Sequence, residues 1–517
     1  MMPISDLTQN GPLLIGIDVG TSNIKAAAFT NDGRVVAEAS LPTPTHVPAP
    51  GQAQYAGEQL WDTVATVLRR VNDALTTPEA IVGVAVASMG EAGVALDATG
   101  RVLAETLAWF DPRPAPQAQW LERTVGRERL FAVTGLTPLP VFGLPKILWL
   151  LEHRAVQVSS MVRWLHIADF IAYKLSGVQA TDPSLASRTL VFNLERREWD
   201  EALLHDVGLS PSLMAPIVES GSRLGTVTSE AAALTGLPTT ASVAAGGQDH
   251  VCGALALGVT KSGEVLNSLG TAEVMLAALE RRVYDPQFAV QGYAQGAHVV
   301  PGLYYAFGAM FSSGASVDWA RALLGVTDHE AYRQLLLEAA GVPAGSRGVH
   351  FLPHLHLANA PFEDALGRGA LIGLRASHDR AALLRSVLEG LAYESRLSLE
   401  GLEPFLTAPA TRITAIGGSA RNALLMGVKA SVLNRALEVA DVPEAVCLGA
   451  ALLAGVGAGV YADALEAAAS VRAQRQRIEP DATLAAVYEP RFQQVYKPLY
   501  ATLRATGHAI AALEPEA

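Results

Sequence analysis

The chain has 517 residues, of which 50% are hydrophobic and 17% are charged. This length exceeds what one hydrophobic core usually serves, so we expect two sizeable domains. The net charge of −12 argues against an extended nucleic-acid or anionic-membrane surface, because phosphate groups are bound by an excess of Lys and Arg.

Cysteine content and apolar runs indicate the cellular compartment. The only two cysteines, Cys252 and Cys447, form neither a disulfide framework nor a metal-ligand spacing. The first ten residues lack the basic and apolar regions of a signal peptide. The apolar run 445–461 contains four glycines and falls short of a membrane span, so it predicts a buried helix. Together these features predict a cytoplasmic protein.

The first hundred residues predict an α/β order. Apolar segments 14–19 and 24–29 flank a Gly-Thr turn, and residues 35–39 continue as a third strand. Apolar residues at helical spacing follow from 59 to 71, and the apolar run 81–87 suits a buried parallel strand. This order is typical of an α/β domain.

Residues 100–240 are richer in proline and in helical segments, among them 146–153 and 161–175. They predict an insertion that builds a substrate pocket. Gly and Pro interrupt the helical pattern in 235–241, directly before a new apolar strand, which favours an internal boundary there. Beyond it the order of strand, hairpin and helix resumes.

Two short segments about 250 residues apart share one pattern. An apolar strand leads to a Gly-Thr turn, at Gly20-Thr21 and again at Gly270-Thr271, and strand-forming residues follow. Glycine at such a turn lets a ligand approach the backbone, while the hydroxyl and free N–H groups offer donors to an anion. The pair predicts two halves, residues 1–245 and 246–517, each with a phosphate-binding hairpin.

The first hairpin also carries charged groups. Asp18 precedes its glycine, and Thr21, Ser22 and Lys25 follow it closely. A carboxylate here can hold hydrated Mg²⁺ while the turn and the ammonium group meet phosphate oxygens. An ordinary hairpin turn is the alternative for this segment taken alone.

Two further glycine clusters follow apolar strands and precede helices. The segment Gly246-Gly247-Gln248-Asp249 places a carboxylate near a helix N-terminus, where the helix dipole favours its ionised form; a simple N-cap is the alternative. The paired glycines there indicate that something approaches the backbone closely. Gly417-Gly418 can admit a base or a phosphate against the next helix. The Gly417-Gly418 cluster does not fit G-x-G-x-x-G or Walker A, which disfavours Rossmann and P-loop folds.

Together these segments resemble the FGGY family of carbohydrate kinases over roughly residues 13–460. Further similar stretches are a W-x-D-x-R segment at Trp109, a K-x-x-W helix at Lys146, residues 168–177 and 181–192, and the apolar helix that follows Glu444. The resemblance implies an α/β fold of two duplicated actin/hexokinase-like (ribonuclease H-like) ATPase domains that flank a cleft. It also implies ATP and Mg²⁺.

The resemblance assigns roles to individual residues. It implies that Asp249 is the catalytic base and that Asp18 and Asp249 lie at the metal. The implied ATP contacts are Gly20, Thr21, Ser22, Lys25, Gly270, Thr271, Gly314, Asp318, Gly417, Gly418 and Asn422. The implied sugar contacts are Met89, Glu91, Trp109, Asp111, Arg113, Gln248 and Asp249.

Glu91 bears on the choice of substrate. It stands where xylulokinases have the histidine of a Q-M-H-G segment; it agrees with the Q-R-E segment of glycerol kinases, but Gly90 replaces the arginine. Because a carboxylate can accept hydrogen bonds from adjacent hydroxyls, Glu91, Asp111 and Asp249 suit a neutral sugar or polyol. A solvated loop residue is the alternative for Glu91.

The leading hypothesis is ATP-dependent phosphorylation of a pentulose such as xylulose. The alternatives are a kinase for another ketose or polyol, of the fuculose, ribulose, erythritol or glycerol type, and an actin-like ATP-driven switch. A degenerate kinase that senses sugar is a third, against which the presence of Asp249 argues. The expected partners are a small sugar or polyol and ATP, with no nucleic acid and no membrane, and a homodimer is left open.

Overall fold

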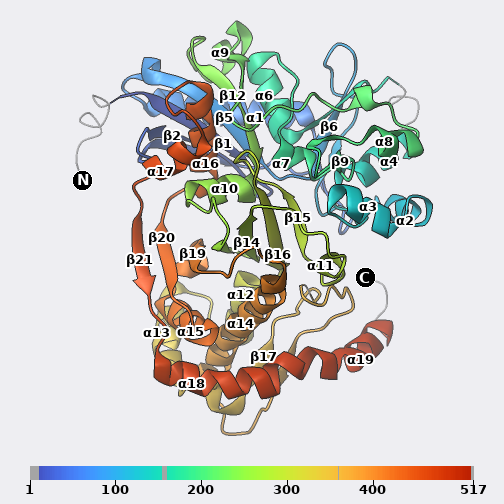
Figure 1. Cartoon of the computed structure of the whole chain (residues 1–517). Coiled ribbons are helices and arrows are strands. Elements are labelled where there is room, and N and C mark those ends of the chain that lie inside the picture. The colour runs from blue at the N-terminus through green and yellow to red at the C-terminus, as the bar shows by residue number, and fades with distance from the viewer. Residues whose placement is uncertain (1–10, 154–159, 359, 514–517) are drawn as a thin grey trace.

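The computed structural model describes residues 11–153, 160–358 and 360–513. The segment 1–10, in which we find no signal-peptide pattern, lies outside these ranges. Two large mixed sheets, one above the other in Figure 1, organise the chain, and helices lie between and around them. Among the described residues, no helix combines the length and apolar character needed to cross a membrane.

The first sheet has the strand order β11-β12-β5-β1-β2-β3. Its strands are β1 (Leu13–Val19), β2 (Asn23–Thr30), β3 (Val35–Pro42), β5 (Ile81–Ser88), β11 (Arg223–Thr226) and β12 (Ser242–Gln248). β5 runs parallel to β1 and β12, whereas β2 pairs antiparallel with β1 and β3. The amphipathic helix α1 (Gly57–Ala74) covers β2 and β3 with its apolar face. The strand and helix order predicted for the first hundred residues is confirmed.

The second sheet has the order β15-β16-β14-β13-β19-β20-β21. Its strands are β13 (Glu264–Leu269), β14 (Glu273–Leu279), β15 (Ala294–Ala297), β16 (Tyr304–Met310), β19 (Arg412–Ile416), β20 (Leu437–Asp441) and β21 (Gln474–Ile478). The antiparallel pair β13–β14 and the parallel neighbour β19 repeat the arrangement of β1, β2 and β5. The predicted duplication is therefore confirmed.

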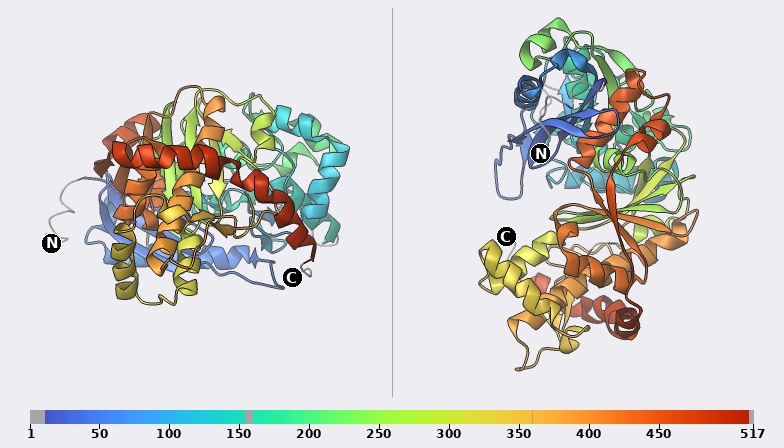
Figure 2. Two further views of the ribbon diagram at one scale, coloured as in Figure 1. Left: turned by 90° about the horizontal axis from the view of Figure 1, so that it is seen from below. Right: turned by 90° about the vertical axis from the view of Figure 1, so that its left-hand side faces the viewer.

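Long helices cover the second sheet. They include α12 (Gly314–Leu323), α14 (Arg380–Leu402) and α15 (Ala423–Leu433), which lie below the sheet in Figure 1. Seen from below in Figure 2, the red helices α18 (Ala482–Arg491) and α19 (Lys497–Leu513) cross the underside of this half.

Two helices interlock the halves. α10 (Asp249–Ala256) follows the first sheet, and α16 (Ala445–Gly457) returns from the second half to pack on β1 and β5. A Cβ atom on Gly16 would lie 1.7 Å from the carbonyl oxygen of Cys447, and one on Gly449 would lie 1.9 Å from that of Cys252. Glycine therefore permits backbone contact between β1, α16 and α10. The predicted buried helix within 445–461 is confirmed.

The segment after the first sheet's early strands builds a helical lobe, at the upper right of Figure 1. Its helices α2 (Ala115–Thr124), α3 (Arg127–Thr134), α4 (Gly143–His153) and α8 (Glu201–Asp206) share an apolar core. The helix predicted over 161–175 is partly wrong, because β8 (Arg163–His166) comes first and α6 (Ile167–Ser176) follows. β8 pairs with β6 (Gly93–Leu96), where the ring of Trp164 fills the space beside Gly93.

The segment 235–241 does not separate the halves. It connects α9 (Ser229–Thr235) to β12, and β12 pairs with β5 inside the first sheet. Its Gly and Pro therefore mark a turn within the first half, and the chain leaves that sheet only after Gln248.

Candidate active site

The first Gly-Thr turn joins β1 to β2 and is held by neighbouring segments. The amide of Gly20 donates to the carbonyl of Asn23 at 3.1 Å, and the Thr43 hydroxyl donates to the carbonyl of Gly20 at 2.7 Å. The Trp109 indole N–H donates to the Thr21 hydroxyl at 3.0 Å. Ser22, at the tip, is exposed. The turn thus presents an ordered backbone whose tip is open to a ligand.

Asp18 lies on β1 directly opposite Lys25 on β2. The Lys25 ammonium group pairs with Glu444 at 2.8 Å, whereas Oδ1 of Asp18 is buried with no hydrogen-bond partner among the described residues. Burial, and then the nearby carboxyl group of Asp249, raise the pKa of Asp18 to about 8, although Lys25 opposes this shift. An orphaned, buried carboxylate oxygen beside a second carboxyl group is suited to a cation.

Asp249 opens helix α10 but does not cap it. The N-cap is Gln248, whose side-chain oxygen accepts from the amide of Val251 at 3.1 Å, so the simple N-cap alternative for Asp249 is wrong. Oδ1 of Asp249 accepts from the amide of His250 at 2.7 Å and from the side-chain amide of Gln248 at 2.6 Å. Among the described residues both bonds end on Oδ1, which leaves Oδ2 for a ligand. Burial raises the pKa of this carboxyl group, which makes it a better proton acceptor.

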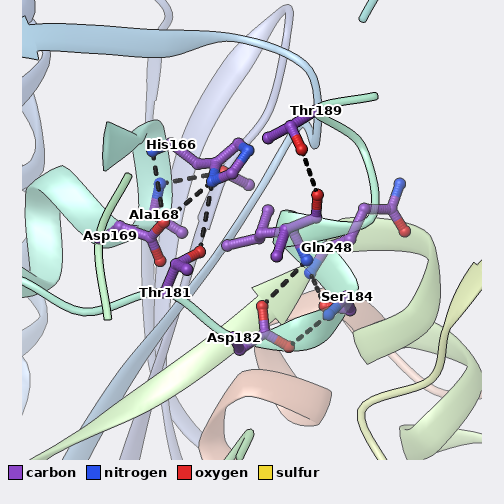
Figure 3. A network of polar contacts seen from close by, with 12 residues as sticks. His166, Ala168, Asp169, Thr181, Asp182, Ser184, Thr189 and Gln248 are labelled. Atoms are coloured by element: carbon purple, nitrogen blue, oxygen red, sulfur yellow. Dashed lines mark hydrogen bonds and ion pairs between the residues drawn. The ribbon is translucent and has the colours of Figure 1, made fainter. Parts of the chain in front are cut away.

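A buried polar network fixes the backbone that leads into Asp249. Figure 3 shows Asp182 and Ser184 beside Gln248. The Ser184 hydroxyl accepts from the amide of Gln248 at 2.9 Å, and Asp182 accepts from the amide of Ser184 at 3.0 Å and from the Ser220 hydroxyl at 2.6 Å. Burial raises the pKa of Asp182 to about 6.

The paired glycines before Gln248 serve this packing. A Cβ atom on Gly246 would lie 1.8 Å from the carbonyl oxygen of Val86, and one on Gly247 would lie 2.6 Å from the Val299 side chain. The group that approaches the backbone closely at these glycines is therefore the protein itself.

Glu91 lies beside Asp249 and is ion-paired. The Nε and Nη2 atoms of Arg188 approach Oε1 of Glu91 at 2.8 Å and 2.6 Å, and the Glu91 side chain is 13% exposed. Burial alone would raise the pKa of Glu91, but Arg188 and Lys146 lower it below its usual range. The solvated-loop alternative for Glu91 is therefore wrong.

The Trp109 segment sits between the first turn and the second half. Asp111 accepts from Nε and Nη2 of Arg113 at 2.9 Å and 2.8 Å and from the amide of Ala53 at 2.8 Å. The Trp109 ring stacks on Phe311, with ring centres 6.4 Å apart. This contact connects the first turn to the segment that leads to Gly314.

Lys146 anchors this side of the site. Its ammonium group donates to the carbonyls of Glu91 at 3.1 Å and Trp109 at 3.3 Å, and it also contacts the carbonyl of Val141. Burial lowers the pKa of Lys146 to about 7. Met89 is buried at the end of β5, where its amide donates to the carbonyl of Val19 at 3.3 Å.

The second Gly-Thr turn joins β13 to β14 and receives the start of α12. The amides of Gly314 and Ala315 donate to the carbonyls of Gly270 and Thr271, each at 3.1 Å. A Cβ atom on Gly314 would lie 2.5 Å from the carbonyl oxygen of Gly270. Gly314 therefore permits the close approach of this helix to the turn.

The remaining predicted nucleotide residues lie beyond this turn. Gly417 has a φ of 98°, and the Gly418 Cβ position meets no atom within 4 Å. Asn422 caps α15 by accepting from the amide of Leu425 at 3.1 Å. Asp318 is exposed and pairs with Arg321 at 3.3 Å. These residues belong to the second half, whereas Asp18, Lys25 and Glu91 belong to the first.

Two residues of the site were not predicted from their own patterns. Glu444, the partner of Lys25, immediately precedes the apolar helix that the sequence identified, and Arg188, the partner of Glu91, lies within the stretch 181–192. The sequence pattern identified both stretches, but it did not show which residues pair with them. The two pairs join residues that are 419 and 97 positions apart in the chain. Spacing along the chain carries no signal for such contacts.

The residues present fit a magnesium ion bound together with phosphates. Among the described residues, no group of three or more His, Cys, Asp or Glu side chains could hold a metal. Mg²⁺ commonly takes one or two protein carboxylates and completes its octahedral shell with water and substrate phosphates. The orphaned Oδ1 of Asp18 beside Asp249 meets that requirement.

Known proteins resemble this chain over most of its length. The models of the N-terminal and C-terminal domains of the FGGY family of carbohydrate kinases match residues 13–256 and 265–458. The xylulose kinase of Bacillus subtilis (strain 168) is 29% identical over 488 residues, which cover 94% of this chain and 96% of that protein. A glycerol kinase of Gloeobacter violaceus is 32% identical over 461 residues, covering 88% of this chain and 90% of that protein. The crystal structure of xylulose kinase from Rhodospirillum rubrum superposes with a TM-score of 0.88 at 32% identity, covering 96% of this chain and all (100%) of that one.

Proposed function

Since the chain belongs to the FGGY family of carbohydrate kinases and is a phosphotransferase with an alcohol group as acceptor, we propose that its substrate is a pentulose, with xylulose as the first choice. The carrying observation is the half-buried Asp249, which lies near both Asp18 and Glu91 and whose Oδ2 is left for a ligand. The xylulose kinases among its relatives support the choice of sugar.

In this proposal Asp249 is the catalytic base. Phosphoryl transfer depends on positioning and charge neutralisation more than on covalent help from the protein. Oδ2 of Asp249 accepts the proton of the attacking sugar hydroxyl, while Gln248 and the amide of His250 hold Oδ1 in place.

The two turns bind the phosphates of ATP from opposite halves. Gly20, Thr21, Ser22 and Lys25 act from the first turn, and Gly270, Thr271 and Gly314 act from the second. Asp18 and Asp249 hold Mg²⁺, which when bound neutralises phosphate charge. The adenosine lies against Asp318, Gly417, Gly418 and Asn422, so that the first half, whose sheet ends at Gln248, binds sugar and the second half binds most of the nucleotide.

The sugar hydroxyls are bound by the groups around Glu91. Glu91, Gln248 and Arg113 supply polar contacts, Trp109 and Met89 supply apolar ones, and Asp111 fixes the guanidinium group of Arg113. Glu91 also favours a second candidate, a glycerol-type polyol, since it matches the Q-R-E segment and a glycerol kinase is among the relatives.

A coupled ADP-release assay with ATP and Mg²⁺ tests the proposal. The panel contains pentuloses, hexuloses, pentitols and glycerol, and D-xylulose is expected to give the highest kcat/KM. A higher value for glycerol would favour the polyol candidate. If no compound in the panel stimulated ADP release but a protein partner did, the actin-like switch would replace the kinase.

We also propose a cytoplasmic location, because both cysteines are free and buried. A homodimer stays a prediction, which light scattering on the purified protein would test.

A further inference from the structure

Arg188 is a deeply buried cation near the proposed sugar site. Its side chain is 3% exposed, and Cζ of its guanidinium group lies 4.9 Å from the ring centre of Phe142 and 5.3 Å from that of Phe307. A buried guanidinium group needs a partner, and Glu91 supplies it. The Cβ position of Gly90 lies 3.0 Å from Cγ of Arg188, so a larger residue at 90 would displace this side chain.

The bonds of Arg188 are one-sided. Nε and Nη2 both end on Oε1 of Glu91, which leaves Oε2 without a hydrogen-bond partner among the described residues. A carboxylate held in this way stays ionised and keeps one oxygen to accept from hydroxyls. The Glu91 carboxylate also lies close enough to Asp249 to raise the pKa of that carboxyl group.

Arg188 also reaches the second half of the molecule. Its Nη1 atom donates to the Tyr305 hydroxyl at 3.4 Å, and both Tyr305 and Phe307 belong to β16. β16 leads directly to Gly314 at the second turn. The guanidinium group therefore contacts a sugar-side carboxylate and the strand that carries part of the nucleotide side.

We propose that Arg188 is the positioning residue of the sugar site: it holds Oε1 of Glu91, leaves Oε2 for a sugar hydroxyl, and ties this carboxylate to β16. The proposal rests on the proposed function, because it presumes that a neutral sugar or polyol lies beside Glu91. Arg188 itself touches no reacting atom and acts through Glu91.

A double-mutant cycle tests this coupling with D-xylulose and ATP. Arg188→Met is expected to lower kcat/KM for the sugar on the order of 100-fold, mainly by raising KM, because it leaves a buried carboxylate unpaired. In a Glu91→Gln background the same change should cost less than about threefold, while KM for ATP stays within about threefold. Equal losses in both backgrounds would overturn the proposal.

Arg282 provides the matched control. It is equally buried at 3%, and it too links the second half to the helical lobe, by donating to the carbonyls of Phe131 at 2.9 Å and Val133 at 3.2 Å. Arg282→Met should change the sugar KM less than about threefold if Arg188 acts through Glu91. An equally large effect of Arg282→Met would show that any broken link between the halves suffices, which also overturns the proposal.

The melting temperature as a function of pH gives a readout that needs no sugar. The titratable groups around Glu91 are Arg188, Lys146, His250 and Tyr305, with Asp249 nearby. Removing Arg188 removes the largest of the charges that lower the pKa of Glu91, so the folded pKa rises from its wild-type value and Arg188→Met should lose stability relative to the wild type as pH rises from 4 to 8. In the Glu91→Gln background this pH dependence of the Arg188→Met effect should disappear. A difference that does not change with pH overturns the proposal.

The outcomes separate the two levels of inference. A wild-type enzyme that phosphorylates no compound in the panel overturns the proposed function and the sugar role of Arg188 with it. An active wild type with additive variants overturns the role of Arg188 alone.

Discussion

The two Gly-Thr hairpins have the same backbone arrangement but carry different charged residues. β1–β2 leaves four residues between the pairs that close it, Val19 with Ile24, and β13–β14 leaves three, between Leu269 and Glu273. Two residues before each glycine stand Asp18 and Ser268, and five residues after it stand Lys25 and Met275. The duplication kept the backbone donors of both turns, but only the first hairpin carries a carboxylate and an ammonium group at these positions.

The second hairpin places its charges beneath the turn. Glu273 is buried and binds Lys429 at 2.5 Å, the Ser395 hydroxyl at 2.6 Å and the Asn267 amide at 2.9 Å. The Ser313 hydroxyl also donates to Glu273, at 3.1 Å. In the first hairpin Lys25 is paired with Glu444 but Oδ1 of Asp18 has no partner among the described residues, whereas the charges of the second hairpin are satisfied within the protein.

The largest expected effect is that of Asp249→Asn. The carboxamide keeps the shape of the side chain but cannot accept the sugar proton, so kcat should fall roughly 1,000-fold. Turnover is measured by coupled ADP release, and ATP binding is measured by calorimetry, which should change little. Near-normal turnover would refute Asp249 as the base. The first hairpin would then have no catalytic residue near Asp18.

Asp18→Asn should produce the next largest loss, on the order of 100-fold in kcat, because in the proposed function it removes the carboxylate that would hold Mg²⁺ at the phosphates. The matched change in the second hairpin, Ser268→Ala, should cost less than about threefold. Comparable losses at the two positions would show that the hairpins are functionally equivalent and would break the comparison.

Although Asp18→Asn should lower activity, it should raise the melting temperature of the ligand-free protein at high pH. The folded pKa of Asp18, about 8, lies above the unfolded value, so its contribution is present at low pH and is lost as pH rises from about 4 to 8. Without Mg²⁺ and ATP, the variant should therefore melt above the wild type at pH 8 and close to it at pH 4. A constant difference across this range would contradict the burial of an uncompensated carboxyl group.

Lys25→Met gives the first hairpin the residue that the second has at the matching position. The expected loss is roughly 10- to 100-fold in kcat/KM for ATP, since the charged contact to phosphate that we propose for Lys25 is removed. Glu444→Gln keeps Lys25 and releases it from its partner, so its effect should stay within about fivefold. A larger effect of Glu444→Gln would assign the phosphate contact to the pair rather than to Lys25.

Much of the fold could be predicted because its signals are local. Turn glycines between apolar segments predicted the hairpins, and helical spacing of apolar residues predicted α1. The packing of α16 on β1 could not be predicted, since it brings Cys447 against Gly16. The charge partners Glu444 and Arg188 escaped prediction for the same reason. Spacing also gave a misleading signal at 161–175, where pairing with β6 outweighs helical pattern.

The smallest effect on activity is expected from a substitution of Lys429, the buried partner of Glu273, which should instead have a large effect on stability. Lys429→Met leaves Glu273 buried beside Asn267 and Ser395 without its cation and should cost about 3 kcal/mol of unfolding free energy, measured by urea titration. Because these charges serve the fold of the turn and meet no ligand, kcat at a temperature where the variant is folded should fall less than about threefold. The double change Lys429→Met with Glu273→Gln should recover part of the lost stability, since no uncompensated charge remains. If instead kcat fell as far as in Lys25→Met, the charges of both hairpins would act on the ligand, and the division between them would not hold.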